Sequence, residues 1–182
     1  MRRSLIIFVV LFGVGASRAH ATTIVPMSFT ELVNASATVV YARVADVRGQ
    51  WTANRQGIES LVTLDVLTPF KGAPGQRVTF SVAGGQAGRY INLLPGAPKF
   101  SAGDLVVVFL TARGARMPIT TGFTQGVYRV SQDASSGAMV VVPPMVDAVA
   151  GPSRITRGDP QRRPLTLAGF HAAVRAAQEA AK

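Results

Sequence analysis

The stretch that decides the fold is residues 58–70, Ile-Glu-Ser-Leu-Val-Thr-Leu-Asp-Val-Leu-Thr-Pro-Phe. Its apolar residues Val62, Leu64 and Val66 point to one side of an extended chain, and the residues between them point to the other. A period of two is typical of a β-strand that has one face in a core. We therefore predict a strand here, with these three side chains directed inward.

Two more strands are predicted beside this one. Residues 38–47 (TVVYARVADV) alternate well enough to form a strand before it, and residues 77–82 (RVTFSV) form one after it. Residues 71–75 (KGAPG) are a turn by composition, so the third strand should pair antiparallel with the second. Residues 49–57 are polar, carry the only tryptophan and predict a hairpin connection. The three strands follow each other as a meander.

The second half of the chain predicts further strands after a long loop. Residues 83–104 contain many glycines and prolines and are too long for an ordinary connection, and loops of this length are usually functional or disordered. Residues 105–110 (LVVVFL) are continuously apolar, which favours a strand buried on both faces. Residues 126–131 and 138–142 predict two further strands.

One helix is predicted before the first strand and another after the last. Ser28 and Glu31 have the spacing of a capping box, in which each side chain accepts a hydrogen bond from the other residue's backbone, and a short helix over residues 29–35 should follow. Thr166 can cap a final helix over residues 167–181, whose apolar residues recur at helical spacing on one face.

These elements predict a mainly β fold. We expect a small antiparallel barrel of five to six strands, of the oligonucleotide/oligosaccharide-binding (OB) kind, with a short N-terminal helix and a C-terminal amphipathic helix. The predicted organisation is a signal peptide at 1–21, the barrel at 22–148, a basic linker at 149–164 and the C-terminal helix at 165–182.

The first residues are typical of an export signal. Arg2 and Arg3 precede a short apolar run over residues 5–14, and Ala19-His20-Ala21 supplies the small-x-small pattern of a cleavage site. The apolar run is about half of the roughly 20 residues that a membrane-spanning helix needs. We predict a periplasmic or secreted protein that begins at Thr22, with an uncleaved anchor as the alternative.

Three stretches resemble a known group of proteins. Residues 37–44 (ATVVYARV), 63–72 (TLDVLTPFKG) and 100–110 (FSAGDLVVVFL) are similar to bacterial secreted proteins of uncharacterised function. The layout over residues 37–131 in turn resembles the netrin-like domain of tissue inhibitors of metalloproteases, an OB barrel. Those inhibitors chelate the protease zinc through an amino-terminal cysteine. This chain has no cysteine, so the resemblance implies the architecture and not the inhibition.

Composition excludes several kinds of chemistry. Without cysteine there are no disulfides, thiol nucleophiles or thiolate metal sites. His20 lies in the leader, and we interpret His171, in the final helix, as a surface histidine. No metal or cofactor is therefore predicted, and we favour a non-enzymatic protein. A secreted hydrolase with an unrecognised carboxylate or Ser/Thr site in the loops is the alternative.

The long loop holds the candidate binding residues Gly84, Gly85, Arg89 and Tyr90. Glycines let backbone amides approach an anion, and the arginine could pair with it. The helix that follows a phosphate-binding loop is not predicted, so a flexible crossing between strands is the structural alternative. Residues 121–126 form a second glycine-bounded loop with the same two interpretations.

The formal charge is +10, and the leader contributes three arginines and no acid, which leaves +7. Arg154, Arg157, Arg162 and Arg163 lie in the predicted linker and are candidate contacts for a polyanion. The alternative is a solvated surface. Nucleic acid is disfavoured because no aromatic residues interleave with these arginines. We expect an exported domain that binds an exported protein or an anionic cell-surface polymer, chiefly through the long loop.

Overall fold

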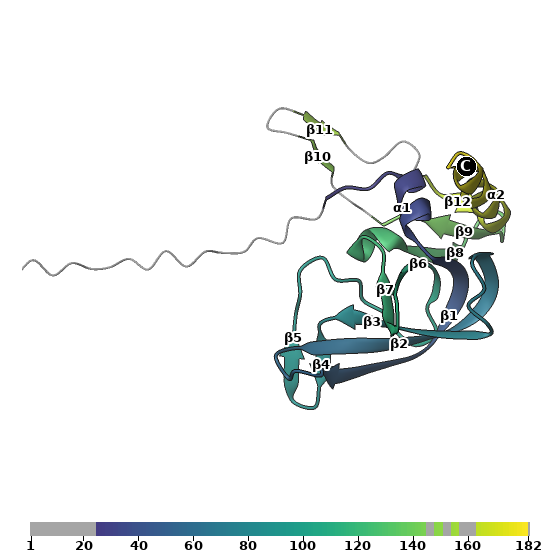
Figure 1. The fold of residues 1–182 in the computed structure, drawn as a ribbon. Coiled ribbons are helices and arrows are strands. Elements are labelled where there is room, and N and C mark those ends of the chain that lie inside the picture. The colour runs from purple at the N-terminus through teal and green to yellow at the C-terminus, as the bar shows by residue number, and fades with distance from the viewer. Residues whose placement is uncertain (1–24, 145–147, 151–153, 157–162, 182) are drawn as a thin grey trace, which may run out of the picture.

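The computed structural model describes residues 25–144, 148–150, 154–156 and 163–181 (Figure 1). The signal peptide predicted at 1–21 lies outside these residues. The elements, in chain order, are α1 (Phe29–Ala35), β1 (Thr38–Trp51), β2 (Ile58–Lys71), β3 (Arg77–Ala83), β4 (Gly85–Ala87), β5 (Tyr90–Asn92), β6 (Leu105–Arg113), β7 (Arg116–Thr120), the 3-10 helix η1 (Phe123–Gly126), β8 (Val127–Gln132), β9 (Met139–Val142), β10 (Ala148–Ala150), β11 (Arg154–Thr156), β12 (Leu165–Thr166) and α2 (Leu167–Glu179).

The fold is mainly β with two helices, as predicted. The main sheet has eight strands in the order β1-β2-β3-β7-β6-β8-β9-β12, and β4–β5 and β10–β11 form two separate hairpins. The sequence predicted six of the eight strands of this sheet and missed β7 and β12. The strands missed are short: β7 contains Pro118, which cannot donate a ladder hydrogen bond, and β12 has only two residues.

Five strands pair in a closed circuit. Strand β1 pairs antiparallel with β2 on one side and with β6 on the other, while β3 meets β7 in parallel at Ser81 and Ile119. Since β7 also pairs with β6, the order β1-β2-β3-β7-β6 returns to β1. The inner core is the set of buried residues between these strands: Val40, Ala42, Val44, Val62, Leu64, Phe80, Val82, Val106, Val108 and Leu110.

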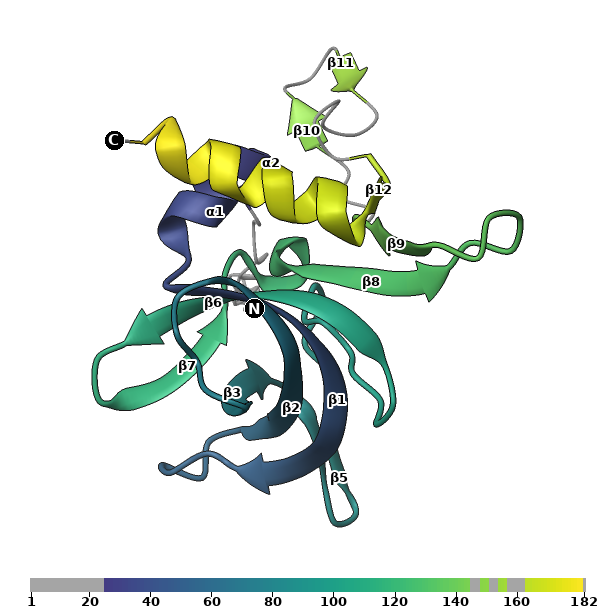
Figure 2. The ribbon, with the colours of Figure 1, turned by 90° about the vertical axis from the view of Figure 1, so that its right-hand side faces the viewer.

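A second core lies under the helices. Figure 2 shows α1 and α2 together on one side of β6 and β8. The ring of Phe170 lies at its centre, 5.5 Å from the ring of Phe29 and 5.2 Å from that of Tyr128. This helix-side core comprises Phe29, Leu32, Val33, Val39, Phe70, Val107, Phe109, Tyr128, Val130, Val141, Phe170, Val174 and Ala177.

Strand β6 separates the two cores. Val106 and Val108 belong to the inner core, and Val107 and Phe109 belong to the helix-side core. The prediction that residues 105–110 are buried on both faces is thus confirmed. The inward faces predicted on the second strand are also confirmed for Val62 and Leu64, whereas Val66 is only partly buried against the inner core.

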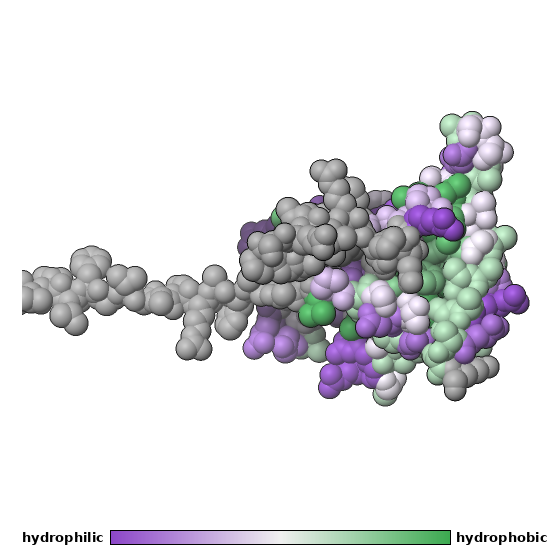
Figure 3. Space-filling view, turned by 90° about the horizontal axis from the view of Figure 1, so that it is seen from above, coloured by the Kyte–Doolittle hydropathy of each residue, from purple (hydrophilic) through white to green (hydrophobic). Residues whose placement is uncertain are grey.

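Both predicted helices are present. The Glu31 amide donates to Ser28 Oγ at 3.2 Å and the Ser28 amide donates to Glu31 Oε2 at 2.7 Å, which confirms the capping box. The amide and the hydroxyl of Ser28 both donate to Glu31 Oε2, and these two hydrogen bonds hold the pKa of the Glu31 carboxyl below its ordinary value. Thr166 caps α2, which ends at Glu179, before the predicted boundary. From above, the surface over α2 is weakly hydrophobic, since its exposed side includes alanines 168, 172 and 176 (Figure 3).

Two segments predicted to lack regular structure contain hairpins. Strands β4 and β5 form a hairpin within residues 83–104. Strands β10 and β11 form another, in which Ala148 pairs with Thr156; β10 begins just before the predicted linker and β11 lies inside it. The rest of the linker prediction falls largely on residues 151–153 and 157–162, outside the described residues. No helix in the described part of the chain is long and apolar enough to span a membrane.

Candidate functional site

The β1–β2 and β4–β5 hairpins are in close contact at the end of the molecule far from the helices. A Cβ on Gly49 would lie 1.8 Å from the carbonyl oxygen of Gln86, so only glycine permits β4 to lie this close to β1. Gly85 has a φ of 132°, and a Cβ there would lie 2.1 Å from Ser60 Oγ. The Ser60 hydroxyl donates to the carbonyl of Gly84 at 2.9 Å. These close approaches fix the β4–β5 hairpin on the β1–β2 ribbon.

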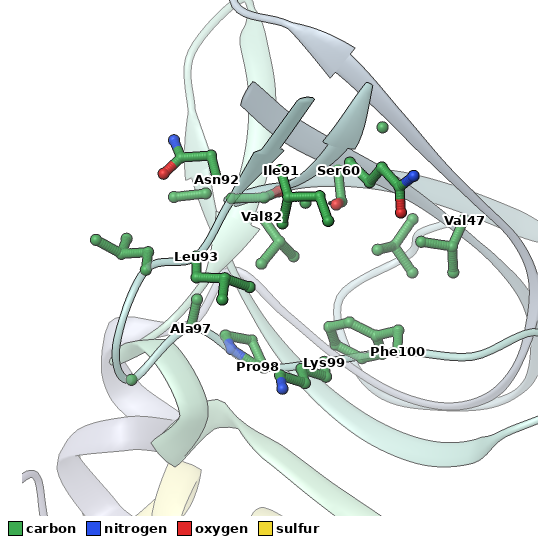
Figure 4. Close-up of a pocket in the computed structure, with 18 of the residues that line it drawn as sticks. Val47, Ser60, Val82, Ile91, Asn92, Leu93, Ala97, Pro98, Lys99 and Phe100 are labelled. Atoms are coloured by element: carbon green, nitrogen blue, oxygen red, sulfur yellow. Dashed lines mark hydrogen bonds between the residues drawn. The ribbon is translucent and has the colours of Figure 1, made fainter. Parts of the chain in front are cut away.

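A cavity of about 680 Å³ lies between this hairpin and the segment that follows it. Val62 and Val82, both buried, form part of its apolar floor. Figure 4 shows Val47, Val82 and Phe100 around the same space, with Ile91 and Leu93 on the wall that β5 and its continuation provide. The cavity thus lies over the inner core, with Val62 and Val82 buried beneath it.

Arg129 on β8 anchors the far wall of the cavity. Its Nη1 lies 2.5 Å from Asp104 Oδ2, its Nη2 donates to the carbonyl of Lys99, and its guanidinium carbon lies 5.7 Å from the centre of the Phe100 ring. Phe100 in turn packs edge-on against Phe80, with ring centroids 5.4 Å apart. The segment that closes the cavity is therefore fixed to both β3 and β8.

The polar groups at the cavity do not form a catalytic arrangement. The Ser60 hydroxyl is directed to a backbone carbonyl, and Lys99 is the single charged residue among the lining residues, all of which are described. No carboxylate or imidazole lines the cavity. Among the described residues, no group of three or more His, Asp or Glu side chains could hold a metal ion.

The four predicted loop residues separate into two pairs. Gly84 and Gly85 line the cavity. Arg89 and Tyr90 do not: the Arg89 Nη2 donates to the Tyr90 hydroxyl at 3.0 Å, and the Tyr90 ring packs edge-on against Trp51 at 5.4 Å. The structure therefore brings two of the four candidate residues to the cavity, while Arg89 lies at the hairpin turn and contacts Tyr90.

Three residues at this end of the molecule were not predicted to lie together there. Val47 and Phe100 line the cavity, and the ring of Trp51 packs against that of Tyr90 on the β4–β5 hairpin. The sequence did contain an indication for Phe100, because it is the one aromatic residue between Pro98 and the buried strand that begins at Leu105. Its position over the inner core depends on Arg129, which is far away in sequence.

The predicted polyanion contacts are only partly described. Arg154 lies in β11, and Arg163 is exposed ahead of α2. Arg157 and Arg162 lie outside the described residues. His171 is partly buried and its ring stacks on that of Phe70 at 4.9 Å, so it is not simply a surface histidine.

The loop at residues 121–126 has a structural role. Gln125 is buried and binds the segment ahead of α1: its Oε1 accepts from the Met27 amide, and its Nε2 donates to the Val25 carbonyl, both at 2.9 Å. Gly122 adopts a φ of 63° at the start of η1. This loop therefore joins the N-terminal segment to the sheet.

No protein-family model, curated protein or solved structure matches this chain. The resemblance to the netrin-like domain thus stays a prediction.

Proposed function

We propose that this protein is an exported, non-enzymatic binding domain that holds an apolar segment of another exported protein in the cavity beside β4 and β5. The observation that carries the proposal is the cavity itself, about 680 Å³ with an apolar floor. Ligand sites in proteins are typically concave, mostly apolar and of roughly this size, about 300–1,000 Å³.

The residues at the mouth favour an apolar ligand. Ile91 and Leu93 line the cavity on the side of β5 and the residues after it. They are nevertheless 62% and 77% exposed, so a ligand could cover them. Covering one such side chain stabilises a complex by about 1.5–3 kcal/mol when burial is complete. Asn92, between them, supplies an amide that can bind the backbone of an extended segment.

We also propose that the closed circuit of five strands is an OB-type barrel. The order β1-β2-β3-β7-β6, with β1 pairing β6, supports it, because OB folds are five-stranded barrels in which the ends of the sheet approach each other. In this proposal the β4–β5 hairpin and residues 93–104 connect β3 to β6 across one end of the barrel, and the cavity lies under that connection.

Export is part of the proposal and rests on the leader. Residues 5–14 are too short an apolar run for the hydrocarbon core of a bilayer, and Ala19-His20-Ala21 further on supplies the small residues that signal peptidase cleaves after. Mass spectrometry of the periplasmic or secreted protein should find Thr22 at its amino terminus. Recovery of the intact chain from Met1 in a membrane fraction would contradict this.

The binding site is tested by filling it. Ala97 lines the cavity, so Ala97→Phe should occupy it, while Ala115→Phe in the exposed β6–β7 turn is a matched control. We expect a peptide rich in leucine and phenylalanine, titrated into the labelled protein, to shift the amide resonances of Ser60, Gly84 and Phe100. A glycine- and serine-rich peptide of equal length should not.

The shifts should disappear in Ala97→Phe and persist in Ala115→Phe. The proposal would be wrong if the apolar peptide shifted resonances elsewhere, or if filling the cavity left its affinity unchanged.

A further inference from the structure

The end of the molecule that carries the two hairpins exposes apolar and cationic side chains together. We define the distal tip as Trp51, Arg55, Arg89, Tyr90, Ile91 and Leu93. In Figure 1 the strands that carry it, β4 and β5 and the adjoining ends of β1 and β2, lie at the lower left, opposite α2. Trp51 is 43% exposed, Tyr90 49%, Ile91 62% and Leu93 77%.

We propose that the distal tip docks on the surface of an anionic lipid bilayer. Trp51 and Tyr90 would lie at the headgroup level, Ile91 and Leu93 would enter the boundary of the acyl chains, and the arginines would contact lipid phosphates. This goes beyond the proposed function, because it names a second partner and a surface that includes residues outside the cavity.

The tip is held in place before any partner binds. Trp51 and Tyr90 come from different hairpins, and their rings pack edge-on at 5.4 Å. The Arg89 guanidinium lies 5.1 Å from the centre of the Tyr90 ring. Arg55 is presented by a turn in which its amide donates to the Thr52 carbonyl at 2.7 Å. Binding would therefore order few additional side chains, which limits its entropic cost.

The charge of this end favours an anionic surface. Residues 46–60 and 83–101 carry four basic and two acidic side chains. One acid, Asp46, pairs with Arg48 at 2.5 Å, and the other, Glu59, accepts a hydrogen bond from Gln50. Arg55, Arg89 and Lys99 have no carboxylate partner among the described residues, so their charge is available to phosphate groups.

The side-chain types favour a bilayer over an acidic polysaccharide. Tryptophan and tyrosine are enriched where an apolar phase meets water, since each ring has an apolar body and a polar group. A hydrated polysaccharide could contact the aromatic rings and the arginines, but it would offer Ile91 and Leu93 no apolar phase. Acyl chains would cover both, and these two are more exposed than the aromatic residues Trp51 and Tyr90 of the tip.

Trp51 is the only tryptophan, so its fluorescence reports on the tip regardless of what the rest of the chain contacts. We would titrate the protein with phosphatidylcholine vesicles that contain phosphatidylglycerol and with pure phosphatidylcholine vesicles. Only the anionic vesicles should shift the Trp51 emission to shorter wavelength. Lipids with brominated acyl chains should quench it, because the ring would lie near the acyl boundary.

Variants separate the apolar and the charged contributions. Replacing both aliphatic residues, Ile91→Asn with Leu93→Asn, should lower the vesicle partition coefficient about tenfold or more. Leu67→Asn is the matched control, since Leu67 is 49% exposed on β2 away from the tip, and it should change nothing. Arg55→Gln and Arg89→Gln should each weaken binding roughly fivefold at low salt, and less as salt screens the charges.

The experiment also separates this inference from the proposed function. Ala97→Phe fills the cavity and should abolish peptide binding while leaving vesicle binding intact. The membrane proposal would be overturned by absence of vesicle binding, by equal losses in the Leu67 and the Ile91/Leu93 variants, or by binding without quenching of Trp51. Binding of an acidic polysaccharide such as alginate, with no binding to vesicles, would assign the tip to that partner instead.

Discussion

Replacing two adjacent valines of β6 tests the central feature of the fold, a strand with a core on each side. Val107 and Val108 are both 0% exposed, but Val107 belongs to the helix-side core and Val108 to the inner core. In an ordinary half-buried strand, neighbouring residues differ sharply in their tolerance of substitution. Here we expect Val107→Ala and Val108→Ala to lower the free energy of unfolding by similar amounts.

The magnitude follows from the buried volume removed. Each substitution deletes two carbons from a fully buried side chain, which costs about 1.6 kcal/mol of transfer free energy. The unfilled cavity adds to this, so we expect about 2–3 kcal/mol in total. Thr63→Ala is the control on β2, because Thr63 faces away from the inner core. It should cost only about 0.5–1.5 kcal/mol, from the lost hydrogen bond with Thr79 Oγ1 at 3.0 Å.

Urea unfolding should be followed by two probes at opposite ends of the molecule. Trp51 fluorescence reports on the end with the two hairpins, and far-ultraviolet circular dichroism reports on α1 and α2. Since β6 contributes to both cores, the transitions should coincide in the unsubstituted protein and in both variants. The free energies then come from the same two-state analysis.

Two results would refute this reasoning. If Val107→Ala were as mild as Thr63→Ala, the helices would not pack on β6 as described. If the two probes gave separate transitions, the helix-side core would unfold independently, and the two cores would not share a cooperative unit.

Other expected outcomes concern turns and caps. Gly85→Ala should destabilise the fold by about 1–3 kcal/mol, since its Cβ would meet Ser60 Oγ at 2.1 Å, and adding Ser60→Ala should recover part of the loss in thermal melts. Ser28→Ala should cost about 1 kcal/mol in urea unfolding through loss of the α1 cap, and no measurable change would contradict the capping box. Hydrogen bonds from Ser135 and Ser136 lower the pKa of Asp133 to about 2, below its unfolded value of 3.8. The ionised Asp133 carboxylate should therefore stabilise the fold fully at about pH 5, and this contribution should be lost as the pH falls through about 2. The difference in Tm between the unsubstituted protein and Asp133→Asn should shrink over that interval.

The strands whose side chains meet a core could be predicted from local pattern. The alternating pattern around Val62 and Leu64 indicates a strand with one buried face. The uninterrupted apolar run at 105–110 indicates a strand with both faces buried. The helix starts at Ser28 and Thr166 were also predictable, since a cap depends on residues within one turn.

The cavity could not be predicted, because its parts are joined by contacts that no local pattern records. Gly49 meets Gln86 only once the β4–β5 hairpin lies across β1, and Arg129 closes the far wall from a strand 25 residues beyond Asp104. From its neighbours in the sequence, Gly49 is typical of a turn. In the structure it continues β1 and permits the close approach of another backbone.

Vesicle binding and stability should be separable in this molecule, because the apolar residues of the distal tip belong to neither core. The helix-side core and β6 contain the side chains whose loss costs most, whereas Trp51, Tyr90, Ile91 and Leu93 keep two-fifths or more of their surface in solvent. Substitutions at such exposed positions usually change the free energy of unfolding by no more than about 0.5 kcal/mol. A loss of vesicle binding in Ile91→Asn with Leu93→Asn, together with an unchanged Tm, would therefore report on the docking surface and not on the fold. Had these four residues been buried, no substitution could have distinguished the two.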